Sequence, residues 1–472
     1  MRPAVLRSCA VNHRWLAPLL VATSLFFGFV AVQRGVIESY DGGVMASVAM
    51  NLVENGSLET LPEADPHGLH TPYTSYGLGT SLVAVPFTAL QLAVDPDGEQ
   101  WVTLVNPLLI ALTGALIVAI GVRLGWRRWL AAAAGLTFGT ATMAPQQSTE
   151  LFSEPGVGLA LLSAVYSLMR WRAGATWAPW LLGAAVAVAI QFHTDSVLLV
   201  GMVVLAAPAF VGWTEAMQPR RLVAVGSPIA TSVILLLAYN AVRFGGPLDF
   251  GIDAQAQGRG FDRPMLDGLA VLLGSPSKGF FWFNLPALLG VAGLVVLWLR
   301  DRALAAAIGV VVAARFVFYA VWFQSGGGVS WGPRFLFPVV PLMIVAAAGL
   351  LEETMVKFPR GLRSAVVGGA RLAAIVGVAV AAVSIWVPYE QVVNEQVNTG
   401  TAAERSSRIH SYSWDVADSH IVQSFHLLDE ARPFPLRHWR GGPSLVGLTA
   451  TGMAMVLGAA AVRVSAESRP IS

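Results

Sequence analysis

The 472-residue chain has little charge and almost no cysteine. Asp, Glu, Lys and Arg make up 12% of it, about half the share of soluble domains, whereas 55% is hydrophobic and the mean hydropathy is +0.63. So little charge over this length excludes a soluble globular protein and predicts a polytopic membrane protein. The one cysteine, Cys9, lies in the N-terminal tail, which excludes an intrachain disulfide.

A cleaved signal peptide is an alternative interpretation of the N-terminus. Arg2, Arg7 and Arg14 form a basic region before the apolar run 15–32. That run is long for a signal peptide, and the "AVQRGV" that ends it is a poor cleavage site, because cleavage needs small residues. We therefore predict an uncleaved first span.

Apolar runs that are long enough to cross a bilayer as helices recur through the chain. We predict about twelve spans, at 16–33, 102–122, 129–145, 155–170, 179–192, 196–212, 222–243, 284–299, 303–322, 336–351, 365–388 and 443–462. The run Tyr76–Val94 is also long enough, but glycines and Pro86 interrupt it. If it crossed, most Lys and Arg of the short connections would move outside, against the positive-inside rule. We predict that it is re-entrant or surface-lying, and that both termini are cytoplasmic.

This topology sorts the acidic residues by side. All but five of the 28 Asp and Glu fall outside, together with the long loops 34–101, 244–283 and 389–442. Acidic residues contribute little to topogenesis, so this bias calls for a functional explanation. We predict an extracytoplasmic working face on a membrane domain of residues 1–388. An extracytoplasmic loop region, 389–442, and a final span with a cytoplasmic tail, 443–472, follow it.

The candidate catalytic residue is Asp41, in "ESYDGGVMASVAMNLVENGSL". Apolar residues recur at helical spacing after it and predict a short interfacial helix in the first outer loop. A carboxylate just before such a helix is favoured by the helix dipole and by free backbone N–H groups. Asp41 is therefore either a simple N-cap or a carboxylate that the cap fixes in place for chemistry.

Other acidic and polar residues are expected at the same level. Glu150 and Glu154, in "QQSTELFSEPG", are four residues apart and predicted to share a helical face. Two stacked carboxylates at a membrane boundary repel each other, which favours a functional role; the solvated start of a helix is the alternative. His193 and Asp195, in "QFHTDSV", crowd one short outer turn, for which an ordinary polar turn is the alternative.

Four basic residues lie singly near this face. Arg243 ends a span in "YNAVRFGG", Lys278 lies beside aromatics in "SPSKGFFWFN", and Arg334 begins a span in "SWGPRFLFP". Arg315 lies about two turns inside the bilayer, where an unpaired guanidinium is costly. It must face a cavity or a salt-bridge partner. All four are candidate groups for binding an anionic lipid phosphate.

The order of these blocks resembles the GT-C superfamily of polyprenyl-phosphate-sugar-dependent glycosyltransferases. The resemblance is to the family 39-like branch of protein O-mannosyltransferases and aminoarabinose transferases, and it spans about Glu38–Leu350. It is carried by the blocks "SYDGGVMASVAMNLVENGSL", "HTPYTSYGLGTSLVAVPF", "STELFSEP", "YNAVRFGGPLDFG", "GFFWFNLP" and "SWGPRFLFPVVPLM". The resemblance implies an all-α GT-C-like bundle of about twelve spans.

The resemblance also implies a reaction. It is the transfer of a sugar, with inversion, from a polyprenyl-phosphate donor to an acceptor hydroxyl of a glycan, lipid or protein, on the outer face of the cytoplasmic membrane. Asp41 corresponds to the family's acidic residue, which serves as a base or orients the acceptor. Family members often carry a second acid there and a lysine before the next apolar piece. This chain has glycines after Asp41 and no lysine in "YTSYG".

Two alternatives remain open. A transporter or flippase of a lipid-linked sugar also has about twelve spans, but it usually shows two repeated halves and helices broken at the midplane. An inactive scaffold is the other. No cofactor is predicted with certainty; a divalent cation held by Asp41 with Glu150 or Glu154 is conceivable, and no partner nucleic acid is expected.

Overall fold

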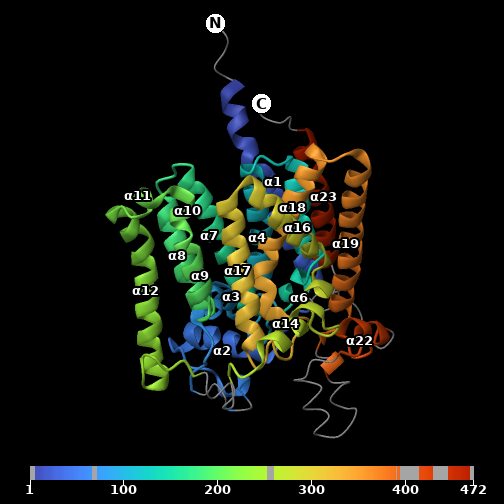
Figure 1. Ribbon diagram of the computed structural model, residues 1–472. Coiled ribbons are helices and arrows are strands. Elements are labelled where there is room, and N and C mark those ends of the chain that lie inside the picture. The colour runs from blue at the N-terminus through green and yellow to red at the C-terminus, as the bar shows by residue number, and fades with distance from the viewer. Residues whose placement is uncertain are drawn as a thin grey trace.

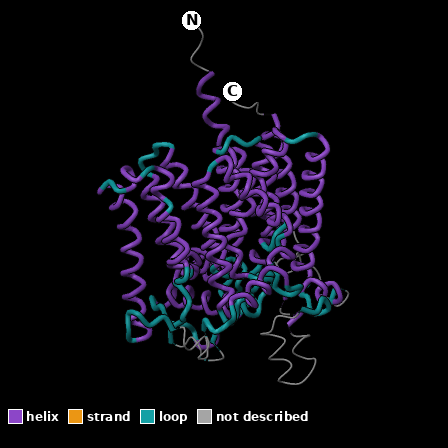
Figure 2. Tube along the Cα trace, viewed as in Figure 1, coloured by secondary structure: helices purple, strands orange, loops and turns teal. Residues whose placement is uncertain are grey.

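The computed structural model describes residues 6–65, 68, 72–251, 260–389, 391–393, 414–428 and 445–467. Throughout these residues the regular secondary structure is helical, and none of them forms a strand (Figure 2). Most of the predicted loop region 389–442 lies outside the described residues. The all-α class predicted from the sequence is confirmed.

The elements follow one another as helices joined by short connections. The first half contains α1 (Leu6–Val32), α2 (Tyr40–Asn55), η1 (Pro62–Ala64), α3 (Leu78–Val94), η2 (Val102–Leu104), α4 (Val105–Arg123), α5 (Arg128–Thr140), α6 (Ala144–Ser148), α7 (Glu154–Arg172), α8 (Ala178–Phe192), α9 (Ser196–Leu205), α10 (Ala207–Val211), α11 (Trp213–Ala216) and α12 (Pro219–Phe244). The second half contains α14 (Met265–Gly274), α15 (Phe280–Phe283), α16 (Leu285–Arg300), α17 (Arg302–Val321), η3 (Arg334–Val339), α18 (Val340–Lys357), α19 (Arg360–Trp386), α22 (His420–His426) and α23 (Leu445–Glu467).

Six helical segments are long and apolar enough to cross a membrane: α1, η2 with α4, α12, α17, η3 with α18, and α19. Each coincides with a span predicted from the sequence. The other predicted spans also fall on helices, namely α5, α7, α8, α9 with α10, α16 and α23. The chain is thus a membrane-embedded, multi-pass protein, while the count of about twelve crossings stays a prediction.

The bundle has a buried centre and lipid-facing edges. The segment of η3 and α18 is 94% buried, whereas the windows of α12 and α19, at opposite edges in Figure 1, are 28% and 17% buried. Large apolar side chains such as Ile234 and Ile375 are exposed on these two edge helices. Exposed aliphatic side chains on regular helices suit contact with lipid tails, because all backbone groups are bonded within the helix.

Glycines allow α16 to approach the central helix closely. A Cβ atom built on Gly293 would lie 2.1 Å from the carbonyl oxygen of Ala346, and one on Gly290 would lie 2.4 Å from that of Met343. Small residues that bring two backbones together are typical of helix packing in membranes. This contact fixes α18, and with it η3, against its neighbours.

Helix α3 begins and ends at the same end of the bundle. Before it, a Cβ on Gly77 would lie 2.2 Å from the carbonyl oxygen of Gln191, near the end of α8. After it, the backbone N–H of Ile37, just beyond α1, donates to Glu99 at 2.7 Å. The residues before and after α3 thus both contact elements at the same end of the bundle. Helix α3 therefore does not carry the chain across the bundle, as the sequence predicts.

The opposite end of the bundle gathers the short connections. Helix α1 begins and α23 ends there (Figure 1). Ion pairs join these connections across the sequence: Arg172 with Asp301 at 2.5 Å, Arg221 with Glu215 at 2.9 Å, Arg300 with Glu353 at 3.0 Å, and Lys357 with Glu353 at 2.9 Å. The predicted inner loops therefore form one surface, and the described parts of the predicted outer loops lie at the other end of the bundle.

Candidate active site

Asp41 lies in the first turn of α2, and the N-cap is Ser39. The interpretation of Asp41 as the N-cap is therefore wrong, because the helix begins one residue earlier, at Tyr40. A carboxylate in the first turn still suits the helix dipole. From this position its two side-chain oxygens contact groups of two other segments.

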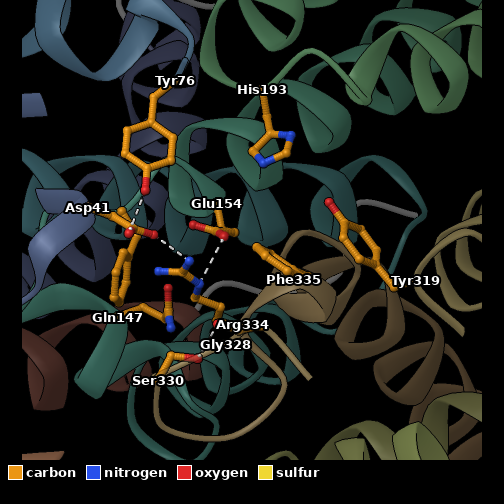
Figure 3. A network of polar contacts seen from close by, with 12 residues as sticks. Asp41, Tyr76, Gln147, Glu154, His193, Tyr319, Gly328, Ser330, Arg334 and Phe335 are labelled. Atoms are coloured by element: carbon orange, nitrogen blue, oxygen red, sulfur yellow. Dashed lines mark hydrogen bonds and ion pairs between the residues drawn. The ribbon is translucent and has the colours of Figure 1, made fainter. Parts of the chain in front are cut away.

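The central contact is between Asp41 and Arg334. Arg334 Nη2 donates to Asp41 Oδ2, and Arg334 Nε lies 3.6 Å from Oε1 of Glu154 (Figure 3). Arg334 begins η3, Glu154 begins α7, and Asp41 is the second residue of α2, so the starts of three segments converge on one point. The Asp41 side chain is 21% exposed and that of Arg334 11%. The arginine is thus largely desolvated, and the carboxylate is the more exposed of the two groups.

The second oxygen of Asp41 is bound by a residue that the sequence did not single out. The hydroxyl of Tyr76 donates to Asp41 Oδ1 at 2.6 Å (Figure 3). Burial, and then the charge of Asp41, raise the pKa of Tyr76 well above its ordinary value, so the phenol stays a protonated donor. The stretch "HTPYTSYG" lacks the lysine that family members often carry, and a tyrosine in such a loop has no sequence signal that marks it as a partner of Asp41.

Arg243 fixes the segment that carries Tyr76. Its Nη1 donates to the carbonyl oxygens of Thr74 at 2.8 Å and of Tyr76 at 2.9 Å, and its Nε donates to the side chain of Asn240. Arg243 is buried, with its guanidinium over the ring of Tyr239. Arg243 thus acts on Asp41 indirectly. It binds the backbone of the loop that carries Tyr76, and the Tyr76 hydroxyl binds the Asp41 carboxylate.

Glu150 does not share a helical face with Glu154. It lies in the irregular segment before α7, so this prediction is wrong; helix spacing does not apply before the helix begins. Glu150 is buried, and its Oε2 accepts from the backbone N–H of Ser39 at 3.0 Å. Burial raises the pKa of Glu150 to about 7. Because it accepts from Ser39, the N-cap residue of α2, the Glu150 carboxyl group supports the start of this helix next to Asp41.

A second polar cluster lies beside the first. Arg315 Nη1 donates to Asp195 Oδ2 at 2.7 Å, and His193 Nδ1 lies 2.7 Å from Asp195 Oδ1. Tyr319 also donates to Asp195. Arg315 is fully buried, so the expectation that it faces a cavity or a partner resolves to a salt-bridge partner. Its charge, followed by that of His193, overcomes burial and holds the pKa of Asp195 below its usual range.

The two clusters share one short segment. Arg315 Nε donates to the carbonyl oxygen of Phe335 at 2.7 Å, and the ring of Phe335 stacks on that of Tyr319, with centroids 4.6 Å apart. Arg334, the preceding residue, belongs to the first cluster. The two clusters therefore meet at consecutive residues of η3; Figure 3 shows the contacts around Arg334, with Phe335 beside it.

Lys278 is buried under the loop that precedes Arg334. Its Nζ donates to the carbonyl oxygens of Gly328, Ser330 and Gly332 at 3.1, 2.5 and 3.1 Å. It does not touch a carboxylate among the described residues. Burial, and then the charge of Arg334, lower its pKa well below the ordinary value.

Gln147 borders the site and was also missed. It is fully buried, its Nε2 donates to Gln146, and within the described chain its Oε1 has no hydrogen-bond partner. Figure 3 shows it beside Arg334. The phenyl ring of Phe152 lies 4.4 Å from the Arg334 guanidinium carbon and forms another wall. Neither residue type carries a sequence signal for chemistry by itself.

The carboxylates are arranged around a guanidinium rather than a metal. Among the residues that the structure describes, no group of three or more His, Cys, Asp or Glu side chains is placed to hold a metal ion. Arg334 reaches both Asp41 and Glu154, so the place between these carboxylates is taken by its side chain. This donor set fits an arginine bridge and does not fit the divalent cation considered from the sequence.

No protein-family model matches the sequence, and no curated protein matches it. Solved structures do match the fold. The apo crystal structure of ArnT from Cupriavidus metallidurans gives a TM-score of 0.53 with 18% identity, over 95% of this chain and 76% of that one. The same protein bound to undecaprenyl phosphate gives 0.51 and 19%, over 95% and 77%. The chain has a GT-C fold.

The shared fold agrees with the GT-C-like all-α bundle that the sequence blocks implied. A weaker likeness, with a TM-score of 0.46 and 13% identity, is to archaeal oligosaccharyltransferase AglB from Archaeoglobus fulgidus in complex with an inhibitory peptide and a dolichol-phosphate. It covers 85% of this chain and 60% of that one.

Within the GT-C fold, the site pairs a partly exposed carboxylate with a buried cation. A carboxylate beside water can accept a proton from a hydroxyl, provided that the hydroxyl comes within hydrogen-bond reach. A desolvated arginine can stabilise an anion that develops next to it. The arrangement is thus chemically suited to a reaction that releases an anionic leaving group and deprotonates a hydroxyl.

Proposed function

We propose that the chain is an inverting glycosyltransferase that uses a polyprenyl-phosphate-linked sugar as donor and a hydroxyl as acceptor. The observation that carries the proposal is the contact between Asp41 and Arg334 with Glu154 beside it, at the end of the bundle where the long loops meet. Support also comes from the ArnT fold, since one of the matched ArnT structures is bound to undecaprenyl phosphate.

In this proposal the two charged groups divide the chemistry. Asp41 accepts the proton of the acceptor hydroxyl, whose oxygen attacks the anomeric carbon. The bond from that carbon to the lipid phosphate breaks, and the phosphate leaves with both electrons, stabilised by Arg334. A phosphate is already a good leaving group, so it needs a cation and no proton. Attack from the face opposite the phosphate inverts the anomeric carbon.

The remaining predicted residues take supporting or binding roles. Glu154, which faces the same guanidinium, would bind sugar hydroxyls and keep Arg334 charged. In the adjacent cluster, His193 is partly exposed and would bind the part of the substrate farther from Asp41, while the buried pair of Asp195 and Arg315 would hold it in place. Glu150 and Arg243 act on the backbone that carries Asp41 and Tyr76.

The proposal places the site on the extracytoplasmic face of the cytoplasmic membrane. The ends of α1 and α23 that point away from the site would then be cytoplasmic, in agreement with the positive-inside rule. The acceptor is a glycan, a lipid or a protein of the cell envelope.

The test compares envelope glycans by mass spectrometry in a deletion strain complemented with wild-type, Asp41→Asn or Arg334→Ala protein. We expect the wild type to restore a glycan that is absent from the deletion strain, and both variants to fail although they are expressed. Asp267→Asn is the matched control, because Asp267 also pairs with an arginine, at an exposed position on α14. Restoration of the glycan by both site variants would overturn the proposal and favour a scaffold or a transporter.

A further inference from the structure

Lys278 has no role in the chemistry proposed above, yet it is buried inside a membrane protein. It lies in the connection between α14 and α15 and is 5% exposed. A buried ammonium group is costly unless hydrogen bonds compensate for its lost hydration. The structure supplies three, from carbonyl oxygens of a single loop.

An ammonium group has three N–H donors and no acceptor. Gly328, Ser330 and Gly332 therefore occupy the full donor capacity of Lys278. To bind a phosphate, the lysine would have to release at least one of these carbonyls into a buried site. This geometry argues against a direct role in phosphate binding and points to the loop as the object on which Lys278 acts.

The loop "SGGGVSWGP", residues 325–333, has no regular secondary structure. Gly327, Gly328 and Gly332 have φ of 91°, 63° and 61°, a region that side chains with a Cβ rarely adopt. A chain rich in such residues has many conformations when it is unrestrained. Its order therefore depends both on internal bonds, from Ser330 to the carbonyl oxygens of Gly327 and Gly328, and on the bonds from Lys278. Three carbonyl oxygens that converge on one point also need hydrogen-bond donors there, and Lys278 Nζ supplies them.

The loop transmits its position directly to Arg334. The backbone N–H of Arg334 donates to the carbonyl oxygen of Gly332 at 3.1 Å, the same oxygen that accepts from Lys278. At Gly327, a Cβ atom would lie 2.6 Å from Arg334 Cγ, so the loop backbone packs against the arginine stem. A change in the loop therefore displaces the guanidinium that contacts Asp41 and Glu154.

We propose that Lys278 is a positioning residue: it gathers three carbonyls of the 325–333 loop and thereby holds Arg334 opposite Asp41 and Glu154. This inference deepens the proposed function, on which its kinetic test rests. The described part of the C-terminal region also contacts this loop and the segment that carries Lys278. The ring of His420, on α22, lies 6.2 Å from that of Trp331, and Ser419 donates to the carbonyl oxygen of Pro276 at 2.8 Å.

The first experiment measures the loop without using activity. In a Cys9→Ser background, which removes the one native cysteine, Val329→Cys introduces a thiol between two of the carbonyls that Lys278 binds. Val329 is 46% exposed, so a maleimide can reach it. We expect Lys278→Met to change the labelling rate several-fold, whereas Lys357→Met, at the opposite end of the bundle, leaves it unchanged. Equal labelling rates with and without Lys278 overturn the proposal.

The second experiment asks whether Lys278 acts through Arg334. We expect Lys278→Met to lower kcat/KM by about tenfold in the wild-type background and by less than about twofold in an Arg334→Lys background, because coupled residues are not additive. Two independent phosphate ligands would instead multiply their effects, and that result overturns the proposal. No transferase activity in the wild type would refute the proposed function, while the labelling experiment would still test the loop.

Lys278→Arg separates position from charge and serves if Lys278→Met does not fold. It keeps the cation, but a planar guanidinium cannot direct three donors to the points where the carbonyls converge. We expect altered labelling of Val329→Cys and reduced kcat/KM in this variant also. Wild-type labelling and activity would mean that only the charge matters, which contradicts a positioning role.

Discussion

The contact between Asp41 and Arg334 has a consequence for donor binding. Both oxygens of Asp41 are occupied, by Tyr76 at 2.6 Å and by the Arg334 guanidinium. A lipid phosphate that binds Arg334 must share it with the carboxylate, and the two anions then repel each other. We expect Asp41→Asn to strengthen the binding of undecaprenyl phosphate although it abolishes transfer.

The size of the effect follows from Coulomb's law. Two unit charges about 6 Å apart repel by about 0.7 kcal/mol at the dielectric constant of water and by about 3 kcal/mol at an effective value of about 20. The Asp41 side chain is 21% exposed and Arg334 is more buried, so the site lies between these limits. The dissociation constant of the lipid phosphate should therefore fall by about 3- to 100-fold in Asp41→Asn.

The assay is equilibrium binding of undecaprenyl phosphate to purified protein in nanodiscs at fixed salt, with Asp267→Asn as the control. Asp267 carries the same charge and pairs with Arg263, but its side chain is 54% exposed. Equal or weaker binding by Asp41→Asn, at a wild-type level of thermal stability, would refute the reasoning. It would mean that the phosphate binds away from this ion pair.

Three further predictions concern single substitutions around the site. Arg334→Lys should lower kcat/KM by about 100-fold, since a single ammonium cannot bridge two carboxylates as the guanidinium does; near-wild-type rates in steady-state kinetics would contradict the bridging role. Tyr76→Phe should lower kcat by about tenfold with little change in the donor KM, because it removes the donor that orients Asp41 Oδ1; a change confined to KM would argue for a binding role instead. Glu150→Gln should remove a pH dependence of the free energy of unfolding. The pKa of the carboxyl is 4.5 in the unfolded chain and about 7 in the folded protein. Its contribution of about 3 kcal/mol to the free energy of unfolding is therefore present below pH 4.5 and is lost as the pH rises through 7. Thermal midpoints of the wild type and this variant, measured from pH 5 to pH 8, should therefore diverge, and parallel curves would count against the buried carboxyl.

Much of the membrane architecture was predictable because it depends on local properties. Apolar runs coincide with the helices, and the charge of short loops separates the two ends of the bundle, since both follow from the cost of placing polar groups in lipid. The prediction that Tyr76–Val94 does not cross came from the same charge argument. Helix boundaries were less predictable: the helix was expected to begin after Asp41, yet α2 begins at Tyr40 and includes Asp41 and the glycines that follow it.

The candidate site was predictable as a set of charged residues but not as a geometry. Asp41, Glu154 and Arg334 were selected because charge at a membrane boundary is costly and therefore informative. Their mutual contacts depend on loops more than 100 residues apart in the chain, and no local pattern encodes such distances. The hydrogen bond from Tyr76 to Asp41 illustrates this limit. A tyrosine in a loop has no sequence signal that distinguishes it from an interfacial aromatic.

The sequence by itself determined that this is a multi-pass helical membrane protein with its acidic residues at one end, because hydropathy and charge act residue by residue. Only the tertiary structure decided which charges meet. It assigned Arg334 to Asp41 and Glu154, Arg315 to Asp195, and Lys278 to backbone carbonyls. The physical reason is that a buried cation must find partners in three dimensions, and those partners are selected by helix packing and loop closure rather than by proximity along the chain.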